Sequence, residues 1–399
     1  MLALVAAALS LASPFELKDG DRVLFYGDSI TEQRLYTTYA EAFVKTRYPH
    51  LKIDFISCGV GGDATWGGWT AAPDERVRRD VKPENPTIVT IMLGMNDGGY
   101  VPFDPKIFAT FQEWYSKLLG WMGEGVPKAK ITLMDSPPYD DLAHPNTDFK
   151  GYSDTVRRFA EYVPKLAEER KLGFVSINAK VTEFIKWALA KDAKKAASIA
   201  PDAIHPGPEG HLVIASQLLR KWNASPVVST VLIDAADGKV IQAENCKVEK
   251  LSGLAWTQTD QALPYPLDPN FTQASAFLDF HQNFNRQMLT VNRLPAGTYR
   301  LEIDGEKITE ASASDWEKGI NLAPLSTPMR KQAQRVMDLT VQRNDAYFLR
   351  WRNLDFQLKD FAATPAASAA LRKVEAEIAK AQVSAAQPSS HRFQLVRSS

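Results

Sequence analysis

The sequence predicts an α/β fold with a parallel sheet in the first part of the chain, followed by a small antiparallel β unit and helices. Between Asp21 and about Trp222, short apolar runs typical of strands alternate with amphipathic helical stretches. After Ser225 the pattern changes to short strands separated by turns that contain glycine. We therefore expect an N-terminal segment at 1–19, an α/β domain at 20–225 and a β-rich unit at 226–310. A helical region at 311–399 is expected to pack back on the other domains.

Five continuous apolar runs are expected to form the parallel sheet, because a strand covered on both faces needs apolar side chains on both. These runs are residues 23–27, 53–59, 87–94, 130–136 and 173–178. Amphipathic segments between the runs predict helices that cover the sheet, among them 39–48, 105–123, 155–170 and 211–222.

The second half of the chain predicts a separate β unit and further helices. Residues 226–251 contain an Asp-Gly turn between β-rich runs, and residues 289–308 contain two glycine turns between alternating strands. No aromatic stripe is visible on a strand face, so a structural buttress is favoured over a carbohydrate-binding module. The apolar residues of 327–356 recur with the period of a helix. The apolar face of this helix is expected to consist of Met329, Ala333, Val336, Met337 and Leu339. Residues 362–390 indicate a second, peripheral helix.

The composition excludes some classes of protein. The 47 Lys and Arg residues balance 47 Asp and Glu residues, which argues against a nucleic-acid binder. Cys58 and Cys246 match no zinc or redox spacing, and two buried thiols are favoured over one disulfide. The short basic spots at Lys194-Lys195 and at 350–352 are interpreted as solvated faces.

The N-terminus carries an apolar run at residues 2–12, too short to span a bilayer and followed by small residues. This pattern favours the end of a secretory signal, although the positively charged start is missing and a short apolar arm is the alternative. No later stretch is long and apolar enough for a membrane helix, so no membrane span is expected. A secreted or periplasmic location is expected, with a cytoplasmic one as the alternative.

Ser29 lies at the end of the first predicted strand, in Gly27-Asp28-Ser29, where the chain turns into a helix. This position places its hydroxyl at the carboxyl edge of the sheet, beside backbone N–H groups that can face a developing negative charge. An N-cap serine is the alternative interpretation of this residue taken alone.

Three further loops at the same sheet edge favour a catalytic site over a helix cap. The second strand leads into a glycine-rich loop that contains Gly62, the third leads to Asn96, and Asp202 precedes His205 by three residues near the end of the α/β domain. Since ligands bind at the carboxyl ends of strands in open α/β sheets, these loops are expected to converge on one crevice.

The residue types suit acyl transfer. His205 can accept the proton of Ser29, and Asp202 can hold the imidazole tautomer through the other ring nitrogen. The N–H groups of Ser29 and Gly62 and the amide of Asn96 can stabilise the oxyanion.

A metal site at His205 and His211 is not expected, because their spacing fits no known motif. His211 is interpreted as a packing residue. Asp28 and Asp97 are interpreted as acceptors for loop N–H groups.

The four segments that contain Ser29, Gly62, Asn96 and the pair Asp202 and His205 resemble the SGNH, or GDSL, hydrolase family. Members of this family are esterases, lipases, thioesterases and carbohydrate deacetylases on a flavodoxin-like three-layer α/β/α fold. The resemblance covers about residues 20–223. It implies a serine hydrolase with Ser29, Asp202 and His205 as catalytic residues, with Gly62 preferred to Gly61 in the oxyanion hole, and with no cofactor or metal. The sequence departs from the pattern at Ile30, a volume-conserving change from Leu. It also departs at Cys58, where many members carry Asn, which puts the bracing of the oxyanion loop in question.

The residues beside the catalytic loops suggest the kind of substrate. Four aromatic residues follow strand-end motifs and are candidate substrate-binding residues, with a place in the domain interface as the alternative: Trp66, Trp69, Tyr100 and Tyr139. Aromatic faces with polar neighbours suit sugar rings. We therefore expect a small-molecule or glycan ester as the substrate, with acetyl the favoured acyl group. The alternatives are a lipase or thioesterase, or an exported glycan-binding protein without activity.

Overall fold

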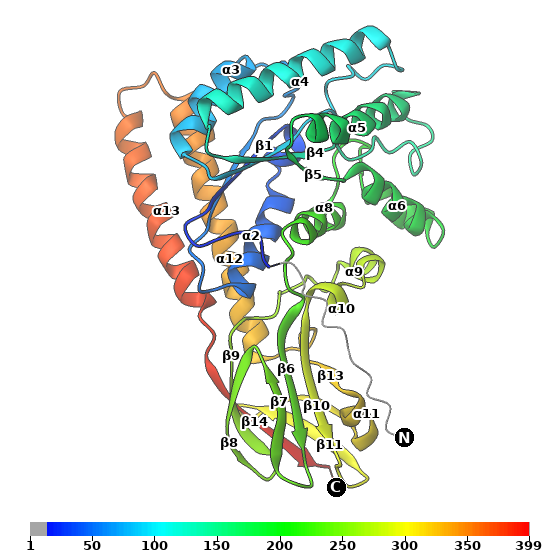
Figure 1. Cartoon of the computed structure of the whole chain (residues 1–399), viewed down its shortest axis with the longest axis vertical. Helices are drawn as coiled ribbons and strands as arrows, with labels where there is room; N and C mark the ends of the chain where they lie inside the picture. Colours follow the sequence, from blue (N-terminus) through cyan, green and yellow to red (C-terminus); the bar gives the residue numbers. More distant parts are fainter. Residues whose placement is uncertain (1–13, 399) are drawn as a thin grey trace.

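The computed structural model describes residues 14–398, in which a five-stranded parallel sheet with its helices is joined to two further sheets (Figure 1). The apolar run at 2–12 lies outside the described residues. Just after it, the ring of Phe15 stacks on Tyr48 with centroids 3.8 Å apart, and the N–H of Glu16 donates to the carbonyl of Trp222. Residues 15–16 therefore pack on the helical layer of the α/β part.

The parallel sheet confirms the predicted fold class. Its strands are β1 Arg22–Gly27, β2 Asp54–Gly59, β3 Ile88–Met92, β4 Lys130–Met134 and β5 Gly173–Val175. Their order is β2-β1-β3-β4-β5, which is the flavodoxin-like order of a doubly wound sheet. The last strand is shorter than predicted because helix α6 already begins at Asn178.

The sheet carries helices on both faces, since alternate residues of β1 enter two different cores. Val23 and Phe25 pack with α2 Leu35–Arg47, α6 Asn178–Leu189 and α8 Pro208–Lys221. Leu24 and Tyr26 pack with α4 Pro105–Gly125 and α5 Tyr152–Glu169. Shorter helical pieces are α1 Ser29–Glu32, α3 Pro73–Arg76, η1 Val77–Val81, η2 Lys82–Glu84 and α7 Ala193–Ala197.

The second half forms two sheets that share one core. One sheet has the order β13-β10-β6-β7 and the other β12-β11-β14-β9-β8. All strand pairs in them are antiparallel except β6 and β10, which are parallel. The strands are β6 Val227–Asp234, β7 Lys239–Glu244, β8 Cys246–Ser252, β9 Ala255–Asp260, β10 Arg286–Asn292, β11 Thr298–Ile303, β12 Glu306–Ser312, β13 Ile320–Asn321 and β14 Ser390–Arg397. The helices within this half are α9 Thr272–Leu278, α10 Phe280–Phe284 and α11 Ala313–Lys318.

Two of these strands lie in the region expected to be purely helical, and that expectation is corrected here. β13 pairs with the edge of β10, and β14 inserts between β11 and β9. The partners of β14 lie about 90 and 130 residues earlier in the chain, so no local turn signal marks the pairing.

Long helices connect the two halves. Figure 1 shows α12 Pro328–Phe348 and α13 Thr364–Ala386 running from the β sheets along the α/β part, with the π-helical segment η3 Leu349–Gln357 between them. Met329 and Val336 of α12 enter the core between the β sheets, whereas Tyr347 and Trp351 enter a core of the parallel sheet. α12 and η3 thus contribute to the core between the β sheets and to a core of the parallel sheet.

The interpretation of residues 350–352 as a solvated face is wrong. Arg350 and Arg352 are buried, and both pair with carboxylates while their guanidinium groups lie over aromatic rings. A long arginine stem can be covered while its charge is paired, which a short window of sequence does not reveal.

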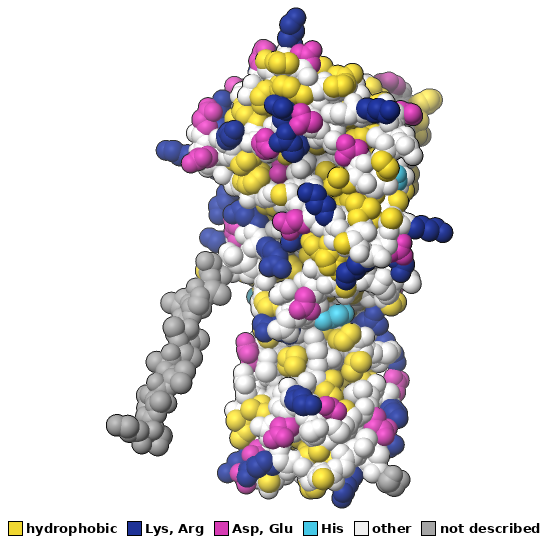
Figure 2. Space-filling view, turned by 90° about the vertical axis from the view of Figure 1, so that its right-hand side faces the viewer, with side chains coloured by type: hydrophobic (Ala, Val, Ile, Leu, Met, Phe, Trp, Pro, Cys, Tyr) yellow, Lys and Arg dark blue, Asp and Glu magenta, His cyan; other side chains and the backbone are white. Residues whose placement is uncertain are grey.

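The surface carries both signs of charge. Figure 2 shows Lys and Arg interspersed with Asp and Glu over the face in view. Cys58 is buried, Cys246 is partly buried, and both are free thiols, as the sequence favoured. Among residues 14–398, no helix is long and apolar enough to cross a membrane.

Candidate active site

The turn after β1 is shaped by Gly27 and Asp28. A Cβ on Gly27 would lie 2.7 Å from the carbonyl oxygen of Met92, so the close approach of β1 to β3 requires glycine here. Asp28 caps α1, and its carboxylate accepts from the N–H of Ile30 at 2.9 Å. Ser29 therefore begins a helix, and its N–H has no intrahelical acceptor.

The structure brings Ser29, His205 and Asp202 together in one hydrogen-bonded chain. Nε2 of His205 lies 2.8 Å from Oγ of Ser29, and Nδ1 of His205 lies 2.6 Å from Oδ2 of Asp202. A carboxylate beside Nδ1 favours the imidazole tautomer whose proton is on Nδ1. Nε2 is then free to accept the serine proton. This is the arrangement that activates a serine hydroxyl as a nucleophile.

Asp202 also organises the turn that carries the histidine. Its Oδ1 accepts from the N–H groups of Ile204 at 3.0 Å and His205 at 2.7 Å, while Ala203 between them adopts a left-handed backbone. Partial burial opposes ionisation, but the hydrogen bonds from His205 and Ile204 outweigh it and lower the pKa of Asp202 below its ordinary value. Asp202 is therefore a carboxylate at neutral pH.

The oxyanion candidates occupy the loops after β2 and β3. The N–H of Gly61 is already used, because it donates to Oε2 of Glu32 at 2.8 Å, whereas the N–H of Gly62 donates to no acceptor within the described residues. The amide of Asn96 donates to the carbonyl of Asp63 at 2.8 Å and accepts from the hydroxyl of Tyr100 at 2.7 Å. One amide hydrogen of Asn96 is thus left over, and Gly62 is better suited than Gly61 to donate to an oxyanion.

Asp28 and Asp97 accept loop hydrogen bonds, as predicted. Asp97 accepts from both the N–H and the hydroxyl of Thr65, which ties the loop after β3 to the loop after β2. Burial raises the pKa of Asp97 to about 6 and that of Asp28 to about 8. Asp28 therefore holds a proton over much of the neutral range.

His211 is fully buried, which confirms its interpretation as a packing residue. Its Nδ1 accepts from the N–H of Tyr36, and its Nε2 lies 2.7 Å from the side-chain oxygen of Gln33. Burial lowers the pKa of His211 to about 3, so the ring is neutral. His211 therefore braces the end of α1 rather than acting on substrate.

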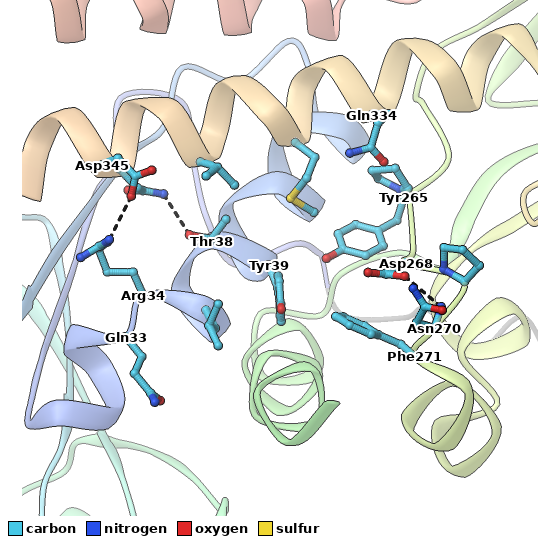
Figure 3. Close-up of a pocket in the computed structure, with 16 residues that line it drawn as sticks. Gln33, Arg34, Thr38, Tyr39, Tyr265, Asp268, Asn270, Phe271, Gln334 and Asp345 are labelled. Atoms are coloured by element: carbon cyan, nitrogen blue, oxygen red, sulfur yellow. Dashed lines mark hydrogen bonds and ion pairs between the residues drawn. The ribbon is translucent and has the colours of Figure 1, made fainter. Parts of the chain in front are cut away.

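Two cavities lie near the site. One, of about 450 Å³, borders Asp202 and is lined also by Tyr139, Asn146, Asp148 and Phe149. The other, of about 620 Å³, lies under α12, where Tyr39, Tyr265 and Phe271 gather (Figure 3). The lining of this second cavity contains Gln33 but none of Ser29, His205 and Asp202, whereas the first cavity is lined by Asp202.

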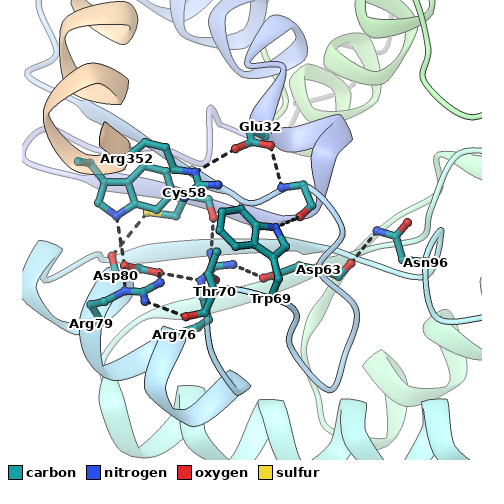
Figure 4. Close-up of polar contacts among 12 residues, drawn as sticks. Glu32, Cys58, Asp63, Trp69, Thr70, Arg76, Arg79, Asp80, Asn96 and Arg352 are labelled. Carbon is teal, nitrogen blue, oxygen red and sulfur yellow. Dashed lines mark hydrogen bonds and ion pairs between the residues drawn. The ribbon is translucent and has the colours of Figure 1, made fainter. Parts of the chain in front are cut away.

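A buried network braces the loop Gly59–Asp63, which carries the candidate oxyanion donor Gly62 and is called the oxyanion loop below (Figure 4). Arg76 pairs with Asp63 and Asp80 and donates to the carbonyl of Cys58 at 2.5 Å. Arg352 pairs with Glu32 at 3.1 Å from the far end of the chain. Sequence reasoning missed these residues, although the alternation of aromatic residues and arginines at 347–352 was a usable signal of stacked guanidinium groups.

The four candidate aromatic residues have different surroundings. Tyr100 bonds to Asn96, and Tyr139 borders the cavity beside Asp202, so both lie next to candidate site residues. The ring of Trp69 is 65% exposed, and its Nε1 donates to the carbonyl of Gly61 at 2.9 Å. Trp66 is partly buried in the tight turn between Ala64 and Gly67.

The fold and this site define an ester hydrolase of the SGNH type. Residues 25–213 match the model of the GDSL-like Lipase/Acylhydrolase family, and this match supports a carboxylic ester hydrolase of the GDSL type. An acetylxylan esterase of Geobacillus stearothermophilus is 25% identical over 224 residues, which are 52% of this chain and 95% of the relative. A solved gut microbial diltiazem-metabolizing enzyme is 24% identical with a TM-score of 0.83 and covers 96% of this chain and 98% of its own. The latter likeness shows that the β sheets and C-terminal helices belong to one shared architecture.

Proposed function

We propose that the protein hydrolyses short acyl esters of carbohydrate, above all acetyl esters, through an acyl-enzyme on Ser29. The observation that carries the proposal is the chain of two hydrogen bonds from Ser29 through His205 to Asp202. Residues 20–225 are the catalytic domain in this proposal. Export of the protein is also part of it and rests on the apolar run at residues 2–12.

In the acylation step, Oγ of Ser29 attacks the ester carbonyl while Nε2 of His205 takes the hydroxyl proton. The N–H groups of Ser29 and Gly62 and the amide of Asn96 donate to the resulting oxyanion. The bond to the alcohol then breaks, and His205 returns the proton to the leaving oxygen. In the second step a water molecule gives a proton to His205 and attacks the acyl carbon. The bond from the acyl carbon to Oγ of Ser29 then breaks, His205 returns the proton to Oγ, and the carboxylic acid is released.

Two observations support a carbohydrate ester. The cavity beside Asp202 combines the rings of Tyr139 and Phe149 with the polar side chains of Asn146 and Asp148. Such a lining offers stacking to the C–H face of a sugar and hydrogen bonds to its hydroxyls. The relative from Geobacillus stearothermophilus carries the name acetylxylan esterase, which supports acetyl as the acyl group.

The test compares substrates on the purified protein and a Ser29→Ala variant. Acetate release is measured on acetylated xylan, pectin fragments and peracetylated sugars, beside chromogenic acetyl and octanoyl esters. We expect Ser29-dependent acetate release and a higher kcat/KM on acetyl than on octanoyl esters. A preference for the longer chain without acetate from any glycan would favour the lipase or thioesterase alternative. Equal background release from both proteins would favour a binding protein without activity.

A further inference from the structure

Two neighbouring residues of the C-terminal segment η3 are linked through other side chains to the loop that carries Gly61 and Gly62. Trp351 and Arg352 follow the long helix α12, and 320 positions separate Arg352 from its partner Glu32. Both side chains are buried against the α/β part rather than against the β sheets. The active-site loop is therefore in contact with the far end of the chain.

Arg352 acts on the loop through Glu32. The two carboxylate oxygens of Glu32 are divided between Nε of Arg352, at 3.1 Å, and the N–H of Gly61, at 2.8 Å. The guanidinium group of Arg352 also lies over the ring of Trp69, 4.7 Å from its centroid, and Trp69 donates to the carbonyl of Gly61. The peptide groups on both sides of Gly61 are thus held by side chains that contact Arg352 (Figure 4).

Trp351 is linked to the same loop through Asp80 and Arg76. Its Nε1 donates to Oδ1 of Asp80 at 3.2 Å, and Asp80 pairs with Arg76. Arg76 in turn pairs with Asp63, the residue that follows Gly62. This path also supplies the bracing that the Cys58 position left in question, because Arg76 donates to the Cys58 carbonyl.

The details favour a functional role over packing alone. Arg352 is only 6% exposed, and its Nη1 has no hydrogen-bond partner within the described residues. η3 is also π-helical, a form that is rare and frequent at functional sites. A loop as rich in glycine as Gly59–Gly62 has little conformational preference, so bonds from outside decide its shape.

We infer that Arg352, together with the segment Leu349–Gln357, is a positioning element for ester hydrolysis, which holds Glu32 and Trp69 so that the N–H of Gly62 faces the oxyanion. This inference rests on the proposed function. Because the oxyanion forms only on the way to the tetrahedral intermediate, loss of the alignment lowers kcat with little change in KM.

The experiment replaces Arg352 with Met, which keeps much of the stem and removes the charge. A matched control is Arg343→Met, since Arg343 of α12 makes the same kind of bond, 2.9 Å to Glu41 of α2, but does not contact the oxyanion loop. The kinetics on a chromogenic acetyl ester are measured together with circular dichroism and the Tm of each variant. We expect Arg352→Met to lower kcat at least about 10-fold, with the loss of about 10²–10³ that follows removal of an oxyanion donor as the upper bound. Arg343→Met lowers the Tm but keeps the kcat of the folded protein.

Two further variants keep the test decisive if Arg352→Met does not fold. Arg352→Lys retains a cation for Glu32, so its kcat is expected to lie well above that of Arg352→Met. Glu32→Gln weakens the pair with Arg352 and is expected to lower kcat. In the Glu32→Gln background, replacing Arg352 with Lys has a smaller effect than in the wild type, because the two side chains act through one contact.

The outcomes separate this inference from the proposed function. A folded Arg352→Met protein with wild-type kcat overturns the inference and leaves the serine esterase intact. Equal losses of kcat in the Arg352 and Arg343 variants, or strictly additive effects of Glu32→Gln and Arg352→Lys, also overturn it. Absence of Ser29-dependent hydrolysis in the wild type contradicts the proposed function itself, and the inference with it.

Discussion

Nε2 of His205 lies 2.8 Å from Oγ of Ser29, although 176 positions of sequence separate the two residues. Ser29 is fixed by the turn from β1 into α1, and His205 is fixed by the turn that precedes α8. Each turn is capped by an aspartate, Asp28 in the first and Asp202 in the second. The contact is thus preorganised by local hydrogen bonds in two independent loops before substrate binds.

Replacement of Asn96 by Ala is expected to lower kcat by about 10²–10³, roughly 2.7–4 kcal/mol, with little change in KM. The reason is that the amide of Asn96 has one hydrogen not used in the bond to the Asp63 carbonyl. Steady-state kinetics on an acetyl ester measure the effect. Tyr100→Phe is the control, because it removes only the hydroxyl that donates to Asn96 and should change kcat far less. An Asn96→Ala enzyme with unchanged kcat would remove this residue from the mechanism.

Asp202→Asn is expected to reduce kcat by up to about 10⁴ while the protein stays folded. The new side chain keeps an oxygen for the N–H groups of Ile204 and His205, but its amide can donate to Nδ1 and select the wrong tautomer. The side chain of Asp202 is 53% exposed, so water can replace part of its role and the loss can be smaller.

Comparison with Asp202→Ala separates the two roles of this residue. The alanine variant loses the turn as well as the tautomer, so we expect a lower Tm for it than for Asp202→Asn. Full activity of the asparagine variant near neutral pH would show that the carboxylate is dispensable.

The parallel sheet and the loops that carry the candidate site were predictable because their signals are local. An apolar run such as 23–27 is typical of a strand buried on both faces, and Gly27, Ser29 and Asn96 lie at or just after the ends of such runs. The convergence of these loops then follows from the geometry of a parallel sheet, without knowledge of distant contacts.

The bracing of the site could not be predicted because its partners are remote. The pair of Arg352 and Glu32 spans 320 positions, and neither residue lies in a motif. The strand β14 is another such case, since it pairs with β9 and β11 only after α12 and α13 have crossed the molecule. Residues that match no local pattern acquire their role from tertiary contacts alone.

Gly62→Ala is expected to lower kcat, because Gly62 has a φ of +80°, in the left-handed region that costs an L-residue roughly 1–2 kcal/mol. A Cβ there would lie 3.7 Å from Cδ1 of Trp69, an ordinary contact, so backbone strain is the main effect. Relief of this strain turns the N–H away from the oxyanion. Gly238→Ala is the matched control: its φ is +59°, nothing lies within 4 Å, and it is in the turn between β6 and β7. Equal kcat in both variants would contradict the role of Gly62.

Asp28 is expected to make the stability of the fold depend on pH between about pH 4 and pH 8. Burial is the main cause that raises the pKa of Asp28 to about 8 from the ordinary 3.8, and the charges of Asp97 and Asp63 raise it further. The hydrogen bond from the N–H of Ile30 lowers this pKa but does not outweigh burial. The folded state therefore binds a proton that the unfolded state has already lost in this range. The free energy of unfolding must then fall as pH rises, and the contribution of Asp28 is complete below its unfolded pKa and lost by about pH 8.

Replacing Asp28 by Asn removes this contribution, because an amide does not titrate yet can still accept from the N–H of Ile30 and cap α1. We expect the two proteins to have similar free energies of unfolding near pH 4 and the Asn variant to become the more stable one as pH approaches 8. Urea denaturation at steps of one pH unit measures both curves, and the other titrating groups, Asp97 among them, are common to both proteins. Parallel curves over the whole range would contradict the raised pKa of Asp28, and a variant that loses stability with rising pH faster than the wild type would reverse the sign of the argument.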